Sequence, residues 1–244
     1  EAVRLYRSLP QTPPEAYTAG LAMLLNNLAN FLQGVGSLDE AVEIGQEAVE
    51  HNRSLVRISP KKYTPNLAAS LDNLASSLSG VGRLEEALEA AQEGERLRRR
   101  LAEVFPAAHT SNLATSLANL ASLLFEARRL EEALEVTQEA LGLYRRLAEA
   151  SPAAYTPGLA GLLNNRAAFL SAAGRRGEAL EAAQEALGLY RGLVEAYPAA
   201  HASDLATSLA NLARVFFDAG RGEEALEAAE EAAGLFRALV EAYP

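Results

Sequence analysis

The sequence of 244 residues contains no cysteine and no tryptophan, and only 6% of it is aromatic. Without cysteine, the chain cannot form a disulfide framework, a thiolate-bound zinc or iron–sulfur site, or a cysteine nucleophile. This absence also fits a reducing compartment, and we expect a cytoplasmic protein. Since 49% of the residues are hydrophobic and few of these are aromatic, the buried core must consist mainly of leucine and alanine, which favours helices.

Basic residues are fewer than acidic ones. Lysine and arginine total 22 against 32 aspartates and glutamates, which gives a formal net charge of −10. An extended phosphate-binding surface needs clustered basic residues, so we do not expect nucleic acid as a partner. No apolar run approaches the roughly 18 residues of a membrane span, and the start of the chain lacks the pattern of a signal peptide. The missing initiator methionine indicates a piece of a longer protein.

The chain does contain a repeat of 46 residues, and such internal periodicity indicates a repeat architecture. Prolines recur at this spacing at Pro14, Pro60, Pro106, Pro152, Pro198 and Pro244. Alanines recur in the same way at Ala41, Ala87, Ala133, Ala179 and Ala225. The spacing predicts five complete units, at 15–60, 61–106, 107–152, 153–198 and 199–244, that form one solenoid. Residues 1–14 align with 139–152 and are expected to be the second helix of an incomplete unit.

Two amphipathic helices are predicted in each unit. In the second unit, apolar residues at helical spacing run to a break at Gly80-Val81-Gly82, and a longer helix of about six turns follows as far as Phe105-Pro106. Thr64-Pro65 and Thr156-Pro157 are each predicted to be an N-cap followed by proline in the first helical position. Ser37 and Glu40 predict a capping box. Because one helix pair cannot close its apolar face, neighbouring pairs must cover it, as in an all-α solenoid.

The segment Leu25-Asn26-Asn27-Leu28-Ala29, followed by Gly36, Ala41 and Ala48, resembles the tetratricopeptide repeat. The likeness is closest to the lengthened repeats of kinesin light chain and of many bacterial signalling proteins. It covers essentially the whole chain, because the same landmarks recur in all five units. The resemblance implies a right-handed α-solenoid of antiparallel helix pairs whose concave groove binds a peptide or a segment of a partner protein.

Three residues depart from the repeated pattern. Arg128 replaces the glycine between the two helices, Gly94 replaces a helix alanine, and Arg166 stands where the other units have leucine. Arg166 has two interpretations. Its aliphatic stem could pack while the guanidinium reaches solvent, or its charge could face a ligand.

No residue pattern indicates catalysis or a metal site. Adjacent glutamates such as Glu85-Glu86 point about 100° apart on a helix and cannot converge on one substrate atom, whereas the helix dipole explains their first-turn position. The three histidines, His51, His109 and His201, are too scattered for metal binding. Nucleotide, serine hydrolase and metalloprotease motifs are absent. We therefore predict a protein that is not an enzyme and needs no cofactor, and we interpret the basic stretch Arg96–Arg100 as a solvated helix face.

An asparagine recurs once in each unit, and the resemblance places it on the concave face. The series is Asn27, Asn73, Asn119, Asn165 and Asn211. An amide offers both donors and an acceptor, which suits the main chain of an extended peptide. Further candidates on the same faces are Asn26, Asn30, Gln33, Ser76, Ser79, Ser122, Asn164, Ser171 and Arg214. In the alternative interpretation, the asparagines bond only to the neighbouring helix and keep the pairs in register.

The leading hypothesis is thus a non-catalytic scaffold that binds a peptide or a partner protein. A second hypothesis is a sensor, regulatory or self-assembling segment of a larger bacterial protein. Head-to-tail stacking would then cover four apolar residues of the last helix, Leu235, Phe236, Leu239 and Val240. A third is an engineered repeat protein with no natural role.

Overall fold

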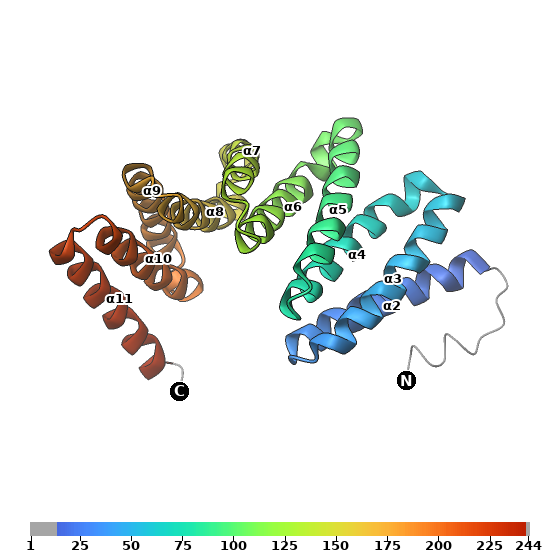
Figure 1. Cartoon of the computed structure of the whole chain (residues 1–244), viewed down its shortest axis with the longest axis horizontal. Helices are drawn as coiled ribbons and strands as arrows, with labels where there is room; N and C mark the ends of the chain where they lie inside the picture. The colour runs from blue at the N-terminus through green and yellow to red at the C-terminus, as the bar shows by residue number, and fades with distance from the viewer. Residues whose placement is uncertain (1–13, 243–244) are drawn as a thin grey trace. The chain divides into compact units, whose positions relative to one another are not determined.

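The structure is a computed structural model that describes residues 14–242, and these residues form α-helices with no strand among them (Figure 1). Ten helices of 21 residues each are present in this range: α2 (Pro14–Gly34), α3 (Leu38–Ile58), α4 (Pro60–Gly80), α5 (Leu84–Val104), α6 (Pro106–Glu126), α7 (Leu130–Ala150), α8 (Pro152–Ala172), α9 (Arg176–Ala196), α10 (Pro198–Asp218) and α11 (Gly222–Ala242). The predicted all-α fold class is confirmed. The helix expected at 1–14 and the last repeated proline, Pro244, lie outside the described residues apart from Pro14.

The chain divides into two compact units, Glu1–Ala127 and Arg128–Pro244. Helices α2 to α6 belong to the first unit and α7 to α11 to the second. Within each unit, every helix contacts the next one along the chain. Three residues connect an even-numbered helix to the following odd-numbered one, and a single residue connects back. Each unit is therefore a stack of antiparallel helices, as in an α-solenoid. We call the even-numbered helices the first helices and the odd-numbered ones the second helices.

The two kinds of helix fill the core differently. Each first helix buries a leucine that is at most 1% exposed: Leu25, Leu71, Leu117, Leu163 and Leu209. Four of the second helices bury a fully covered alanine near their start: Ala41, Ala87, Ala133 and Ala179. A small residue there lets the backbone approach its neighbour closely, while leucine fills the space between helices. The repeated leucines and alanines of the sequence are thus core positions.

Glycine ends several first helices because the backbone there turns left-handed. Gly82 has φ of 76°, donates to the carbonyl of Ser79 at 2.9 Å, and is followed by Arg83, which donates to Leu78 at 2.9 Å. This pair of bonds is the Schellman motif, which satisfies the last carbonyls of α4. Arg128 adopts the same conformation with φ of 61°. A side chain at such a position costs about 1–2 kcal/mol relative to glycine.

The predicted N-caps at threonine are wrong. Helices α4 and α8 begin at the repeated prolines Pro60 and Pro152, so Pro65 and Pro157 lie inside the helices. Thr64 instead donates its hydroxyl to the carbonyl of Pro60 at 2.7 Å. The repeated proline fits the first helical position because its missing N–H would have no helical partner there.

The predicted capping box at Ser37 and Glu40 is also wrong. Ser37 is the N-cap residue of α3, but its side chain makes no capping hydrogen bond. Its ψ of 66° differs from the extended conformation that usually directs an N-cap hydroxyl toward the first turn.

Candidate functional site

The first helices form a continuous surface within each unit. Helix α2 contacts α4, and α4 contacts α6; in the second unit α8 contacts α10. Among the described residues of either unit, neighbouring second helices do not come this close. Because the first helices lie closer together, each unit curves toward them. We call the solvent-facing surface of α2, α4 and α6 the first-helix face of the first unit. The same surface of α8 and α10 is the first-helix face of the second unit.

Most of the repeated asparagines have free amides. Asn27, Asn119 and Asn165 are exposed and Asn211 is half-buried. Within the described residues, none of these four side chains forms a hydrogen bond. An unpaired amide at a surface retains its full capacity to donate and accept. The side chains available to a ligand therefore recur in both units.

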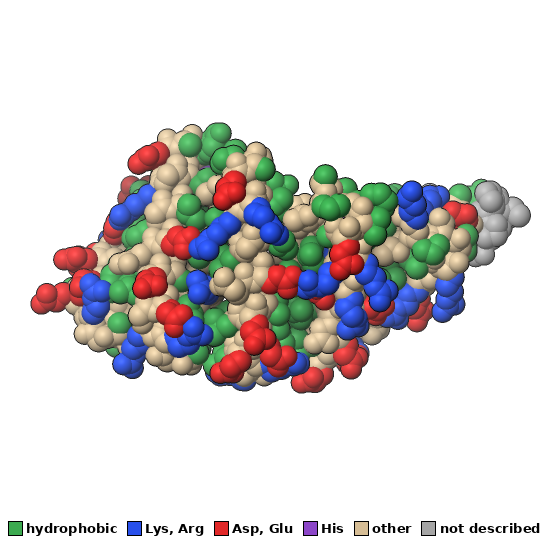
Figure 2. Space-filling view, turned by 90° about the horizontal axis from the view of Figure 1, so that it is seen from above, with side chains coloured by type: hydrophobic (Ala, Val, Ile, Leu, Met, Phe, Trp, Pro, Cys, Tyr) green, Lys and Arg blue, Asp and Glu red, His purple; other side chains and the backbone are tan. Residues whose placement is uncertain are grey.

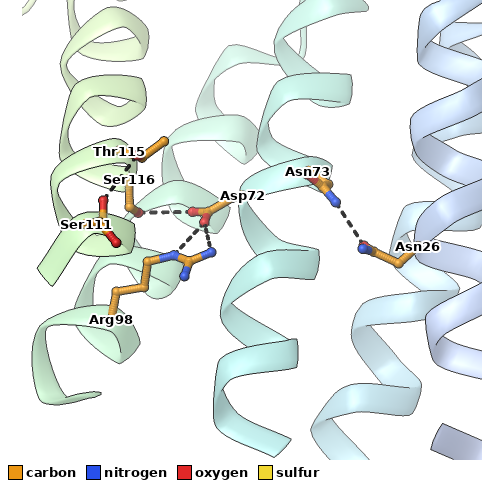
Figure 3. Close-up of polar contacts among 7 residues, drawn as sticks. All are labelled: Asn26, Asp72, Asn73, Arg98, Ser111, Thr115 and Ser116. Atoms are coloured by element: carbon orange, nitrogen blue, oxygen red, sulfur yellow. Dashed lines mark hydrogen bonds and ion pairs between the residues drawn. The ribbon is translucent and has the colours of Figure 1, made fainter. Parts of the chain in front are cut away.

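Asn73 differs from the other members of the series. Its Nδ2 donates to Oδ1 of Asn26 at 3.1 Å, which links α4 to α2 (Figure 3). Beside this contact, Nε2 of Gln33 donates to the Ser76 hydroxyl at 2.6 Å. Between α2 and α4, the polar side chains therefore follow the alternative interpretation, in which they bond to the neighbouring helix and keep the pairs in register.

A small cavity opens on the first-helix face between α4 and α6. It has a volume of about 190 Å³ and is lined by candidate residues Ser76, Ser79, Asn119 and Ser122. Ser79 donates to the Glu126 carboxylate at 2.6 Å. The exposed Asn30 of α2 makes no side-chain hydrogen bond within the described part of the chain.

In the second unit, the candidate residues divide between surface and interior. Arg214 is exposed, as is Asn165. Asn164 is only 7% exposed, and its Oδ1 accepts a hydrogen bond from Ser208 at 3.2 Å. We therefore assign Asn164 to helix packing rather than to the binding surface. Ser171 donates to Asp218 at 2.6 Å, which links α8 to α10.

The interior of the first unit contains an ion pair that sequence reasoning missed. Nε of Arg98 on α5 donates to Oδ2 of Asp72 on α4 at 2.7 Å, and Ser116 of α6 donates to Oδ1 at 3.0 Å (Figure 3). The Arg98 and Asp72 side chains are 11% and 15% exposed. Burial raises the pKa of Asp72, while Arg98 and Ser116 act in the opposite direction. The interpretation of Arg98 as part of a solvated face is thus wrong, because it binds a carboxylate between three helices.

Gly94 makes room for this carboxylate. A Cβ atom at residue 94 would lie 3.0 Å from Oδ1 of Asp72, closer than ordinary van der Waals contact. Alanine occupies the equivalent positions Ala48, Ala140 and Ala186, all of which are fully buried. The replacement of alanine by glycine is therefore explained by the aspartate opposite it.

Most charges lie on the second helices, where they form two recurring ion pairs. The first joins successive second helices: Arg53 to Glu93 at 2.6 Å, Arg145 to Glu185 at 2.9 Å and Arg191 to Glu231 at 3.2 Å. The second joins the residue before a second helix to its first turn, as from Arg83 to Glu86 at 2.6 Å. On the face that Figure 2 shows, basic and acidic side chains of the described residues are interspersed.

The three histidines have separate local partners. His109 lies edge-on to the Phe105 ring, with centroids 6.5 Å apart, and Nδ1 of His201 lies 3.1 Å from Asp204. No group of three potential metal ligands occurs within residues 14–242. Nor is any described helix long and apolar enough to span a membrane.

Comparison with protein families identifies the repeat. Family models described as "Tetratricopeptide repeat" match residues 20–100 and, separately, residues 113–152, 159–198 and 205–242. No match was found among curated proteins.

Several solved structures share the fold. BtubC (BKLC) from P. vanneervenii is 22% identical with a TM-score of 0.75, over 99% of this chain and 89% of that one. A putative kinesin light chain of Podosopora anserina with nearly identical TPR-like repeats is 21% identical with a TM-score of 0.68, over 87% and 93%. MamA from Desulfovibrio magneticus RS-1 is 18% identical with a TM-score of 0.57, over 89% and 96%. At these identities the similarity concerns the fold.

Proposed function

Because the chain belongs to the tetratricopeptide repeat family, whose repeats generally mediate protein–protein interaction, we propose that its first-helix face binds an extended segment of a partner protein. The chain acts as a non-catalytic scaffold. In the first unit the free amides of Asn27 and Asn119, and in the second unit those of Asn165 and Asn211, bond to the main chain of a bound segment, and the residues that vary between repeats select its side chains.

The observation that carries this proposal is the free state of these four amides. An asparagine kept only for register would bond to the neighbouring helix, as Asn73 does to Asn26. The other four have no such bond within the described residues, although they occupy the same position of the repeat. A peptide main chain presents alternating donors and acceptors, which an amide can satisfy together.

The test compares two sets of amides at repeat spacing. In one variant, Asn27, Asn119 and Asn165 become alanine together. In the control, Gln46, Gln92 and Gln184 on the second helices become alanine, which removes amides from a different face. Peptides selected by the natural chain from a random peptide library serve as ligands, and fluorescence anisotropy measures their affinity.

We expect the asparagine variant to lose about 1.5–4.5 kcal/mol of binding free energy, since each net hydrogen bond contributes about 0.5–1.5 kcal/mol. The glutamine variant should bind as the natural chain does. Unchanged affinity in the asparagine variant, with an unchanged melting temperature, would refute the proposal.

Self-association is a second candidate function, favoured by apolar side chains on α11. Phe236 and Val240 are 40% and 70% exposed, whereas Leu235 and Leu239 are partly buried. Exposed apolar groups of this kind can contact another copy of the chain. Light scattering over a range of protein concentrations tests this idea, because a molar mass that stays monomeric would exclude it.

A further inference from the structure

A second cavity lies away from the first-helix face, in the unit Arg128–Pro244. Its volume is about 540 Å³, and its walls come from α7, α8 and Arg175, the residue before α9. On α7 it is lined by Glu131, Glu135 and Gln138, and on α8 by Arg166. Arg166 follows Asn165 directly, so the two side chains project about 100° apart around the helix. The cavity and the row of asparagines are therefore separate surfaces.

Arg166 occupies a position that is part of the core in three other repeats. Leu74, Leu120 and Leu212 stand at the equivalent positions and are 5–7% exposed. Arg166 is half-buried, and within the described residues it forms neither a hydrogen bond nor an ion pair. Partial burial of a charge without a partner costs free energy. Arg166 therefore retains its full capacity to form hydrogen bonds with a ligand.

The other charged groups around this cavity define what it can accept. Glu131 and Glu135 are exposed and form no ion pair with described residues. Arg175 donates to both carboxylate oxygens of Glu178, at 2.7 and 2.6 Å. The hydrogen bond from Arg175 lowers the pKa of Glu178, and the charge of Arg166 lowers it further. The open groups are therefore one guanidinium and two carboxylates, beside the amide of Gln138 and the apolar side chains of Leu134 and Leu170.

The first unit supplies an internal comparison. A cavity of about 430 Å³ between α3 and α5 is also rimmed by carboxylates, including Glu50 and Glu89, but Leu74 lies where Arg166 lies in the second unit. Both cavities lie beside second helices and over leucines of a first helix. The first cavity is also lined by a cation, Arg53, but Arg53 is paired with Glu93 at 2.6 Å. The two cavities therefore differ in that only the second is lined by an arginine without an ion pair among the described residues.

We propose that the Arg166 cavity binds a segment of a partner protein in which an acidic side chain adjoins a basic one. The acidic side chain pairs with Arg166, because a guanidinium binds a carboxylate in a planar, two-bond geometry. The basic side chain pairs with Glu131 and Glu135, which would repel an acidic segment that brought no cation. Leu134 and Leu170 cover the aliphatic parts of both side chains. This surface is independent of the first-helix face.

The test uses a short fluorescent peptide of alternating glutamate and lysine, with all-glutamate and all-lysine peptides of equal length for comparison. The natural chain should bind the alternating peptide most tightly. Arg166→Leu should weaken this binding by about tenfold or more, while its melting temperature stays the same or rises because leucine restores the apolar core. The combined Glu131→Gln and Glu135→Gln variant should weaken binding of the alternating peptide and strengthen that of the all-glutamate peptide.

The control is Arg237→Leu, which removes the same charge from the exposed surface of α11. It should bind the alternating peptide like the natural chain. The proposal is overturned if the natural chain does not bind the alternating peptide, if Arg166→Leu binds it equally well, or if Arg237→Leu loses as much affinity as Arg166→Leu.

Discussion

The first and second helices have equal lengths but very different charges. The five first helices contain nine charged residues, whereas the five second helices contain 37. Outward positions of the first helices carry amides and hydroxyls instead, among them the repeated asparagines. A surface that binds the main chain of a partner needs donors and acceptors without strong charge, because unpaired charges would favour particular side chains. The smaller charge of the first helices is thus consistent with the proposal that their surface binds partners of varied sequence.

The two kinds of helix also hold each unit together by different forces. Both kinds of helix bury leucine, as at Leu163 and Leu141. Neighbouring first helices contact one another directly, whereas successive second helices are connected by long side chains such as Arg145 and Glu185. Exposed ion pairs of this kind contribute at most about 1 kcal/mol each. The free energy of unfolding should therefore depend mainly on the leucines, and the charges should adjust spacing and solubility.

Leu163→Ala on α8 tests this difference with the largest expected effect. Leu163 is fully buried, and removal of a buried leucine costs about 2–5 kcal/mol, because it loses apolar burial and leaves a cavity. Leu226→Ala on the second helix α11 is the control, since Leu226 is 61% exposed. Denaturant unfolding should show a large loss for the first variant and a small one for the second. Equal losses would show that burial of a leucine does not determine its contribution to stability.

The fold could be predicted from the sequence because it depends on periodic features. Leucine at helical spacing, alanine at the close contact and glycine at Gly82 each have a local physical cause that repeats every 46 residues. The starts of the helices were predicted less well. Thr64-Pro65 matches the pattern of an N-cap followed by proline in the first helical position. Pro60 fits the first helical position equally well five residues earlier, and the helix begins there because a single residue connects it to α3.

The polar contacts were harder to predict because they occur once rather than repeatedly. Asp72, Gly94, Arg98 and Ser116 lie on three helices, and each is unremarkable alone. A signal was present, since Gly94 breaks the alanine series in the same unit in which Asp72 replaces the Asn26 of the first unit. To explain these two departures from the repeat, one must know which side chains contact each other between neighbouring helices, and the periodicity of the sequence does not give those contacts.

Gly94→Ala tests whether the glycine at residue 94 and the aspartate at residue 72 depend on each other. In the natural chain, the new Cβ would press on Oδ1 of Asp72, and we expect a loss of about 1–3 kcal/mol, as for other overpacked cores. In the Asp72→Ala background the same change should stabilise the chain by up to about 1 kcal/mol, because alanine favours helix over glycine. Denaturant unfolding of the natural chain, the two single variants and the double variant gives the interaction free energy between the two positions. Equal effects in both backgrounds would show that Asp72 does not explain Gly94.

The smallest effect concerns two carboxylates, Glu86 on a second helix and Asp72 on a first helix, whose pKa values shift in opposite directions. The hydrogen bond from Arg83 lowers the pKa of Glu86, at the start of the second helix α5, whereas burial raises the pKa of Asp72 on α4. Glu86 therefore stabilises the fold above its unfolded pKa, and this contribution is lost as pH falls through its lower folded pKa. Asp72 stabilises it below its unfolded pKa, and that contribution is lost as pH rises through its higher folded pKa.

Arg83→Ala separates these two cases. It should raise the pKa of Glu86 toward the ordinary value for glutamate and leave the pKa of Asp72 unchanged, because the Arg98 contact is intact. Carboxyl-carbon chemical shifts followed by NMR during an acid titration measure both values in the same sample. If the pKa of Glu86 does not change, the bond between Arg83 and Glu86 does not persist in solution. The charges of the second helices would then act only through their summed electrostatic field. The difference between the first and second helices in how they stabilise each unit would then depend on packing alone.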